Sequence, residues 1–288
     1  MIYSTPSLSI IVASYNRPKT LLRLLDQIND QRCVDFKMVD VCVVDDGSED
    51  SAFFGNGMKD LKEDDYDQYV VDYKYQLLYI YRKRHPDGLA RVYSSRNLAA
   101  QNTKGEYILQ LDDDVEFHPY LLNMLQSMAG MAQDEHWVWT PRISDNKDWD
   151  KDGHSADHNW DRGIDGRWWD GRVSWQESHW GSADSSGMFM PRRTWEAVGG
   201  YSEEMDFRMG AGDQELALKV QKLGVMPRDV KLWIAPYFVN KADEETGSVR
   251  MEMIDRWLTA ARQKGLEPVR NEELMQRNHP DLYEWQNV

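Results

Sequence analysis

Hydrophobic residues in the first 140 positions alternate between short continuous runs and runs with helical spacing. The continuous runs predict four buried strands, at residues 8–13, 41–44, 77–81 and 107–111. Residues 17–28 space their leucines three and four apart, and Arg17-Pro18 favours a helix start, while residues 91–103 predict a second helix that ends before Gly105. Near-continuous apolar strands that alternate with helices predict an α/β fold, with a Rossmann-like, mostly parallel central sheet flanked by helices.

Regular periodicity disappears between residues 144 and 182, where six of the twelve tryptophans lie. Such a long irregular connection is usually functional or disordered, and this many tryptophans favour an ordered insertion. Five later elements are expected, namely a strand at 187–190, a helix from Pro191, a helix at 214–223, a strand at 231–234 and a helix at 250–264. We therefore divide the chain into residues 1–140, residues 141–240 of the same domain, and residues 241–288, a C-terminal helical extension.

The chain is acidic, with 34 Lys plus Arg against 49 Asp plus Glu and a formal net charge of −15. This charge opposes binding to nucleic acid or anionic membranes unless the basic residues cluster. They do cluster at 82–104, which holds six basic residues and one acid, a net charge of +5. No apolar run approaches the ~18 residues of a membrane span, and no signal peptide is visible. Of the two cysteines, Cys42 lies in an apolar run and is expected in the core, so we expect a cytoplasmic protein.

Two acidic clusters follow directly after predicted strands: Asp45-Asp46, and Asp112-Asp113-Asp114. Ligands of open α/β sheets bind at the carboxyl ends of the strands, where both clusters fall. Side chains alternate along a strand, so Asp112 and Asp114 are expected on one side, where they could bind a hard divalent cation. A solvated acidic turn after the strand, and an ordinary Asp-Gly turn at Asp46-Gly47, are the plain structural alternatives.

Four motifs in this order resemble the family 2 glycosyltransferases of the GT-A fold. They read SIIVASYNR at 9–17, VVDDGS at 43–48, RNLA at 96–99 and GEYILQLDDD at 105–114. Residues 187–193, 198–201 and 210–216 look like the acceptor half of the family and resemble a galactosyltransferase-type C-terminal segment. The resemblance covers roughly residues 7–225, and it is the order and spacing of the motifs that make it specific. It implies that residues 1–140 are the nucleotide-sugar-binding half and residues 141–240 the acceptor-binding and catalytic half, with the tryptophan-rich segment as an acceptor-side insertion.

The resemblance implies a metal-dependent transferase that moves a sugar from a nucleoside-diphosphate sugar, expected to be a UDP-sugar, to an acceptor hydroxyl. It assigns Asp112-Asp113-Asp114 to the DXD motif, with Asp112 near the ribose and Asp114 as ligand of Mn²⁺ or Mg²⁺. The residues implied in nucleotide-sugar binding are Ser14, Asn16, Arg17, Asp45, Asp46, Arg96, Asn97, Asp112 and Asp113. Ser14 and Asn16 could otherwise cap the helix that begins at Arg17-Pro18.

Inverting transfer also needs a general base that deprotonates the acceptor hydroxyl. Asp213 matches the second acid of the family's Glu-Asp pair, while Gly212 stands where the first acid is expected. Asp213 is the predicted base, with Glu215 as the fallback and helix capping by Asp213 as the structural alternative. An inverting outcome is favoured.

The acceptor is less well defined by the sequence. Aromatic rings stack on sugar faces, so Trp168, Trp169 and Trp180 are candidate acceptor contacts, together with Gly187, Gly200 and Glu215, although the tryptophans could equally form a small core. A glycan, lipid-linked, protein or small-molecule acceptor is expected, and a nucleic-acid acceptor is disfavoured by the net charge. The first strand lacks the glycine fingerprint of a dehydrogenase. The main non-enzymatic alternative is a carbohydrate-binding or scaffolding protein on a decayed transferase fold.

Overall fold

The computed structural model describes most of the chain between residues 6 and 281. The described residues are 6–49, 66–86, 88, 90–117, 119–131, 136–141, 176–177, 187–206, 211–225, 228–230, 234–236 and 271–281. None of the helices described is both long and apolar enough to cross a membrane.

A mostly parallel sheet forms the centre of the protein, in the strand order β3-β4-β2-β1-β5-β9-β7-β10-β8. The strands of its N-terminal half are β1 (Leu8–Ser14), β2 (Val39–Asp45), β3 (Tyr66–Asp72), β4 (Gln76–Arg82) and β5 (Tyr107–Asp112). Those of the second half are β7 (Trp139–Pro141), β8 (Gln176–Glu177), β9 (Phe189–Pro191) and β10 (Arg228–Val230). Strands β4, β2, β1 and β5 are parallel, whereas β3 and β9 run antiparallel to their neighbours. A separate two-stranded sheet pairs β6 (Val115–Phe117) with β11 (Ile234–Pro236).

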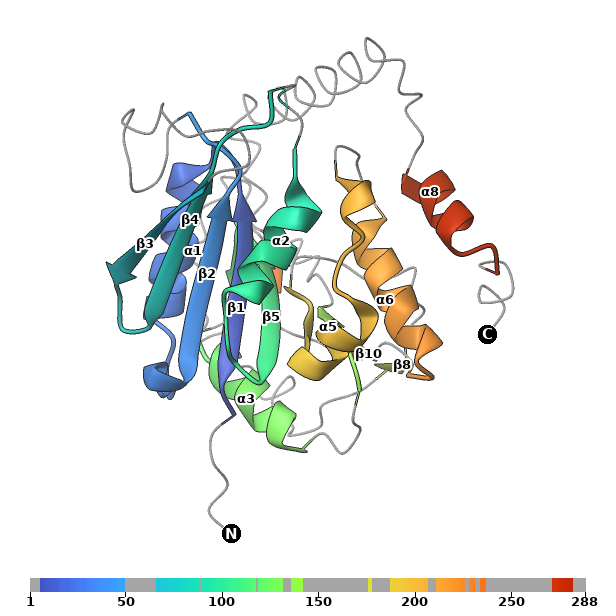
Figure 1. Cartoon of the computed structure of the whole chain (residues 1–288). Coiled ribbons are helices and arrows are strands. Elements are labelled where there is room, and N and C mark those ends of the chain that lie inside the picture. The colour runs from blue at the N-terminus through green and yellow to red at the C-terminus, as the bar shows by residue number, and fades with distance from the viewer. Residues whose placement is uncertain are drawn as a thin grey trace, which may run out of the picture.

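Helices cover both faces of the sheet, as the two-sided apolar strands require. One face packs against α1 (Pro18–Asn29) and α3 (Leu121–Met131), and the opposite face against α2 (Val92–Gln101), α5 (Arg192–Val198) and α6 (Gly212–Lys222). Figure 1 shows α2, α5 and α6 in front of the strands and α8 (Asn271–Asn278) beside α6. Successive residues of β1 pack against opposite faces of the sheet: Ile10 and Val12 belong to the core on the α1 side, and Ile11 to the core on the α2 side.

The predicted fold class and the predicted elements of the first half are confirmed. The strands extend one or two residues beyond the apolar runs, and the two helices lie within one to three residues of their expected limits. In the second half, β9, α5 and α6 match the expected strand and helices, and Gly224 after α6 has a positive φ of 85°. Trp137 and Trp139 stack with ring centroids 4.0 Å apart and are buried in the core.

Other elements differ from the sequence prediction. Of the strand expected at 231–234, only Ile234 is among the described residues: it begins β11, and β10 ends at Val230. Two short strands thus flank residues 231–233, which lie outside the described part, as do the helix expected at 250–264 and nearly all of the tryptophan-rich segment. The structure adds β3, β6, α3 and α8, which the hydrophobic pattern did not reveal.

The strand order creates a switch point between β1 and β5. From β1 the chain moves outward to β2 and β4, and it then returns to β5 on the other side of β1. The connections leave these neighbouring strands in opposite directions, which opens a crevice at their carboxyl ends. Ser14 ends β1 and Asp112 ends β5, so the fold places the first and fourth motifs at this crevice.

Candidate active site

The acidic motif forms the end of β5 and the turn that follows it. The strand ends at Asp112, and Asp113 and Asp114 make the turn into β6. Strand alternation therefore does not extend to Asp114, and its side chain is placed by its partner Arg17 instead. Asp113 is buried, whereas the side chains of Asp112 and Asp114 are 29% and 25% exposed and so can be reached by a ligand.

Two residues from the end of β1 hold the turn. The Ser14 hydroxyl donates to Asp113 Oδ2 at 2.7 Å, and Arg17 Nη1 lies 3.0 Å from Asp113 Oδ1 and 2.5 Å from Asp114 Oδ2. Burial alone would lower the pKa of Arg17, but the charges of Asp113 and Asp114 raise it, so the guanidinium stays ionised. Neither Ser14 nor Asn16 caps α1, whose N-cap position is Arg17 with no side-chain cap bond.

The acidic turn retains surplus negative charge in spite of Arg17. Burial raises the pKa of Asp114 to about 6, and the neighbouring Asp113 and Asp112 add to the rise although Arg17 opposes it. Within the described residues, no three His, Cys, Asp or Glu side chains converge to form a metal cage. Mg²⁺-type cations are commonly held by one or two carboxylates together with substrate phosphates, so Asp112 and Asp114 fit a cation that arrives with a diphosphate.

The motif after β2 is tied to the motif after β1. The Asn16 backbone N–H donates to Ser48 Oγ at 2.8 Å, and Asn16 Oδ1 accepts from the Glu49 N–H at 2.8 Å. Asp45 Oδ1 accepts from the Ser48 N–H at 2.7 Å, and Asp45 Oδ2 accepts from the Tyr79 hydroxyl. The Asp45 side chain thus stabilises the turn after β2, as in the structural alternative for this motif. Burial raises the pKa of Asp45.

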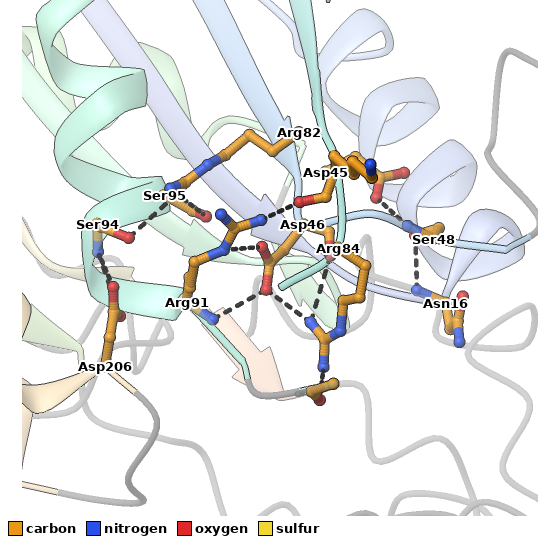
Figure 2. Close-up of polar contacts among 12 residues, drawn as sticks. Asn16, Asp45, Asp46, Ser48, Arg82, Arg84, Arg91, Ser94, Ser95 and Asp206 are labelled. Carbon is orange, nitrogen blue, oxygen red and sulfur yellow. Dashed lines mark hydrogen bonds and ion pairs between the residues drawn. The ribbon is translucent and has the colours of Figure 1, made fainter. Parts of the chain in front are cut away.

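Asp46 is enclosed by two arginines of the basic cluster (Figure 2). Arg91 donates from Nε to Oδ1 at 2.8 Å and from its backbone N–H to Oδ2 at 2.9 Å, and Arg84 Nη1 donates to Oδ2 at 2.6 Å. Both Arg91 and Asp46 are buried. Asp46 thus joins the ends of β2 and β4 to the start of α2, and a contact between Asp46 and the nucleotide stays a prediction. Lys83 is exposed, whereas Arg84 is not.

The first turn of α6 carries Asp213 toward the end of β5. Asp213 Oδ1 lies 3.2 Å from Arg96 Nη1 and accepts from the Tyr201 hydroxyl at 2.9 Å. Arg96 Nη2 lies 2.5 Å from Asp112 Oδ1. The capping interpretation of Asp213 is wrong, because the N-cap of α6 is Ala211, which has no side-chain cap bond. The structure therefore brings Asp112, Arg96 and Asp213 together from three elements.

Asn97, next to Arg96, holds the segment that leads to Tyr201. Its Nδ2 donates to the Tyr201 carbonyl at 3.0 Å and its Oδ1 accepts from the Tyr201 N–H at 2.9 Å. A Cβ on Gly200 would lie 2.6 Å from Asn97 Oδ1, and Gly200 has a φ of 62°, so glycine is required there. Asn97 and Gly200 thus have a structural role in this fold, and their contacts with donor and acceptor stay predictions.

Glu215 lies on the same helix as Asp213 but is 1% exposed. Its Oε1 accepts from the Ser202 hydroxyl at 2.6 Å and lies 3.4 Å from His279 Nε2 beyond α8, while Lys219 Nζ is 3.4 Å from Oε2. These groups enclose the carboxylate, which argues against the predicted acceptor contact and against a role as fallback base. Gly187 is buried beside β9. Trp168, Trp169 and Trp180 lie outside the described residues.

Several residues of this region were not predicted from sequence. Asp206 is buried and accepts from the Tyr93 N–H at 2.7 Å and the Ser94 N–H at 3.2 Å, at the start of α2 (Figure 2). Burial raises the pKa of Asp206 to about 6. Gln110 is a fully buried amide within the apolar strand β5. That polar residue in an apolar run was a usable signal in the sequence, whereas nothing local marks Asp206.

The fold has counterparts among known proteins. The mostly parallel sheet flanked by helices, with acidic residues at the β1/β5 switch point, agrees with the GT-A class of glycosyltransferase folds that the sequence motifs predicted. A family model described as Glycosyl transferase family 2 matches residues 9–173, more than half of the chain, so the protein belongs to glycosyl transferase family 2. The resemblance to a galactosyltransferase-type C-terminal segment stays a prediction.

The solved structures that are similar to the chain include a mannosyltransferase and TarS. The mannosyltransferase PcManGT from Pyrobaculum calidifontis, in complex with GDP-Man and Mn²⁺, has a TM-score of 0.51 and 16% identity over 90% of this chain and 65% of that one. S. aureus TarS 1-349, in complex with UDP-GlcNAc, has a TM-score of 0.49 and 16% identity over 79% of this chain and 56% of that one. The chain thus spans less than two-thirds of either protein. No curated protein sequence matches it.

Proposed function

We propose that the protein transfers a sugar from a nucleoside-diphosphate sugar to an acceptor hydroxyl, with a divalent cation and with inversion at the anomeric carbon. The observation that carries the proposal is the convergence of Asp112, Asp114 and Asp213 at the β1/β5 crevice of a family 2 fold. The GT-A fold and the family support glycosyl transfer in general. Cation, donor and stereochemistry are the finer parts of the proposal.

Donor binding is assigned to the three loops that follow β1, β2 and β5. Asp112 and Asp114 would hold Mn²⁺ or Mg²⁺, which as a Lewis acid supplies charge stabilisation for the departing diphosphate. Ser14 and Arg17 keep the turn closed, so that the exposed edges of Asp112 and Asp114 face the crevice. Asp45 ends β2 opposite Ser14, and Asn16 follows β1 and bonds to the loop after β2. This is the region where we place the base and ribose.

Asp213 is the proposed general base. Asp213 lies in the first turn of α6, where the positive end of the helix dipole favours a carboxylate, and a carboxylate oxygen can accept a proton. The acceptor hydroxyl would give its proton to Asp213 as its oxygen attacks the anomeric carbon on the side opposite the leaving diphosphate. The sugar–phosphate bond breaks as the new glycosidic bond forms, which inverts the anomeric configuration.

A donor panel tests this function directly. The protein is incubated with UDP-glucose, UDP-galactose, UDP-GlcNAc and GDP-Man in Mn²⁺ or in EDTA, and the released nucleotide is measured with water as the acceptor. GDP-Man is included because PcManGT was solved with it and with Mn²⁺. Cation-dependent release from a UDP-sugar is the expected result. Release from GDP-Man alone would show that the donor is not a UDP-sugar. Equal release in Mn²⁺ and in EDTA would show that the reaction does not need a divalent cation. Absence of both binding and release with every donor would contradict the function.

A further inference from the structure

Arg96 is shared by a carboxylate of the donor side and a carboxylate of the acceptor side. It projects from α2 and is 5% exposed, with Nη2 on Asp112 at 2.5 Å and Nη1 on Asp213 at 3.2 Å. A planar guanidinium can serve two carboxylates at a fixed separation, which a lysine ammonium does far less well. One buried side chain therefore sets the position of Asp213 relative to the end of β5.

Tyr201 makes a second, uncharged link between the same two elements. Its hydroxyl lies 2.9 Å from Asp213 Oδ1 and 2.5 Å from Gln110 Oε1, and Gln110 precedes Asp112 by two residues on β5. A hydroxyl has one proton, so both bonds form together only if the Gln110 amide is turned to donate, leaving the Tyr201 proton for Asp213. Burial raises the pKa of Tyr201, and Asp213 raises it further, so the hydroxyl stays protonated and able to donate.

The two links also support each other. The Arg96 guanidinium carbon lies 5.4 Å from the centroid of the Tyr201 ring, within the range of a cation–π contact. The Tyr201 backbone is fixed by Asn97, the neighbour of Arg96 on α2. A rigid frame of α2, β5 and the Gly200-Tyr201 turn thus surrounds Asp213, which is what a group that must meet a reacting hydroxyl needs.

We propose that Arg96 and Tyr201 are positioning residues that orient Asp213 with respect to the donor site, and that Arg96 couples the two sites because it is shared with Asp112. The inference rests on the proposed function, in which Asp213 is the base and Asp112 a donor-side carboxylate. It assigns Arg96 to this bridge, whereas the sequence resemblance assigned it to nucleotide-sugar binding.

Tyr201→Phe tests the positioning of Asp213. The variant keeps the ring and removes only the hydroxyl, so kcat for nucleotide release should fall by about 10- to 100-fold, the usual effect of one hydrogen bond to a charged group. The donor KM and the dissociation constant of UDP should stay within about twofold. Tyr75→Phe is the matched control, because it also loses a buried hydroxyl bond, to the Leu25 carbonyl at 2.9 Å on the α1 side of the sheet, and it should retain kcat.

Arg96→Met tests the coupling by a measurement that needs no turnover. Removing a positive charge 2.5 Å from Asp112 should tighten Mn²⁺ binding several-fold, as measured by electron paramagnetic resonance, while kcat falls. Arg96→Lys keeps the charge and should leave Mn²⁺ affinity nearer to wild type, and kcat should still fall because the bridge is lost. The circular dichroism spectrum of each variant shows whether it is folded before it is assayed.

The outcomes separate the two levels of the proposal. If the wild type turns over a donor but Tyr201→Phe keeps full kcat, the positioning role is wrong and the proposed function stands. If Arg96→Met binds Mn²⁺ no more tightly than wild type, the coupling is wrong. If the wild type binds neither Mn²⁺ nor any sugar nucleotide, the proposed function fails and the inference fails with it.

Discussion

The aromatic ring of Tyr93 occupies the space that a side chain at Gly212 would need. A Cβ built on Gly212 would lie 2.1 Å from Tyr93 Cε1 and 2.6 Å from its hydroxyl oxygen, and Tyr93 is itself buried against Tyr201. Gly212 stands where the family pattern has the first acid of its Glu-Asp pair. Its replacement is therefore explained by packing, which weakens the interpretation of this chain as a decayed transferase.

The Tyr93–Gly212 contact predicts a strong steric effect. Gly212→Ala should destabilise the protein by about 1 to 3 kcal/mol, the usual cost of overpacking a core, although alanine is the better helix former. Chemical denaturation measures the loss. Gly212→Ala in a Tyr93→Val background should cost much less, because valine leaves room for the added methyl group. Equal losses in both backgrounds would show that the ring is not the cause.

Asp206 predicts a specific dependence of stability on pH. Its pKa in the folded protein is about 6, above the usual 3.8, so between pH 4 and pH 6 the folded state binds more protons than the unfolded state. The contribution of Asp206 to the free energy of unfolding therefore falls as pH rises through this window and levels off above it, by on the order of 2 to 3 kcal/mol.

The variant Asp206→Asn isolates that contribution. Asparagine can still accept from the Tyr93 and Ser94 N–H groups but does not ionise. We expect the stability of Asp206→Asn relative to wild type to increase between pH 4.5 and pH 7.5, as measured by urea unfolding at each pH. A difference that is independent of pH would contradict the assignment, since all other titrating groups are common to both proteins.

Because two arginines enclose Asp46, we expect its replacement to lower the stability of the folded protein. Asp46→Asn leaves Arg91 and Arg84 without their charged partner, and losing one member of a buried ion pair typically costs about 3 to 5 kcal/mol. Thermal unfolding checks this. Glu49→Gln is a suitable control, because Glu49 is exposed and only its backbone N–H bonds to Asn16. Unchanged stability of Asp46→Asn together with lost nucleotide affinity would instead make Asp46 a ligand of the donor.

The separate roles of Asp114 and Asp213 predict different defects. Asp114→Asn removes charge from the proposed cation site and should abolish Mn²⁺-dependent donor binding. Asp213→Asn should leave donor binding largely intact and reduce kcat by about 10²- to 10⁴-fold, the usual contribution of a general base. Calorimetry with UDP and Mn²⁺, together with nucleotide release, distinguishes the two. Full activity of Asp213→Asn would show that another group is the base.

The sequence predicted those parts of the fold that depend on local pattern. Apolar runs and leucine spacing were sufficient for β1, β2, β4, β5, α1 and α2, because each of these elements is buried along a regular period. Short strands such as β6 and β10 have no period to detect, and β3 contains polar residues at its edge of the sheet.

The site was predictable in its residue types and less so in its contacts. Motif order placed Asp112, Asp114 and Asp213 in one region, which the strand order then brought together. The pairing of Arg96 with both Asp112 and Asp213 depends on how α2 and α6 pack, and no sequence spacing encodes it. Helix capping by Asp213, the structural alternative to the predicted base, was wrong because α6 begins at Gly212, two residues earlier than expected, with Ala211 at the N-cap position and a φ of 60°.

Ser14 and Asp113 share a hydrogen bond although 99 residues separate them in the chain. Contacts of such high sequence separation form late, because the loop-closure entropy is lost before the contact contributes any stability. Here β2, β4 and α2 lie within the loop, and β5 can add to β1 only after the intervening chain has been accommodated. A nascent chain that has emerged only as far as α2 therefore has no acidic turn to complete the crevice. Binding of donor and cation would then report completed folding of this domain, which collapse or helix content alone does not.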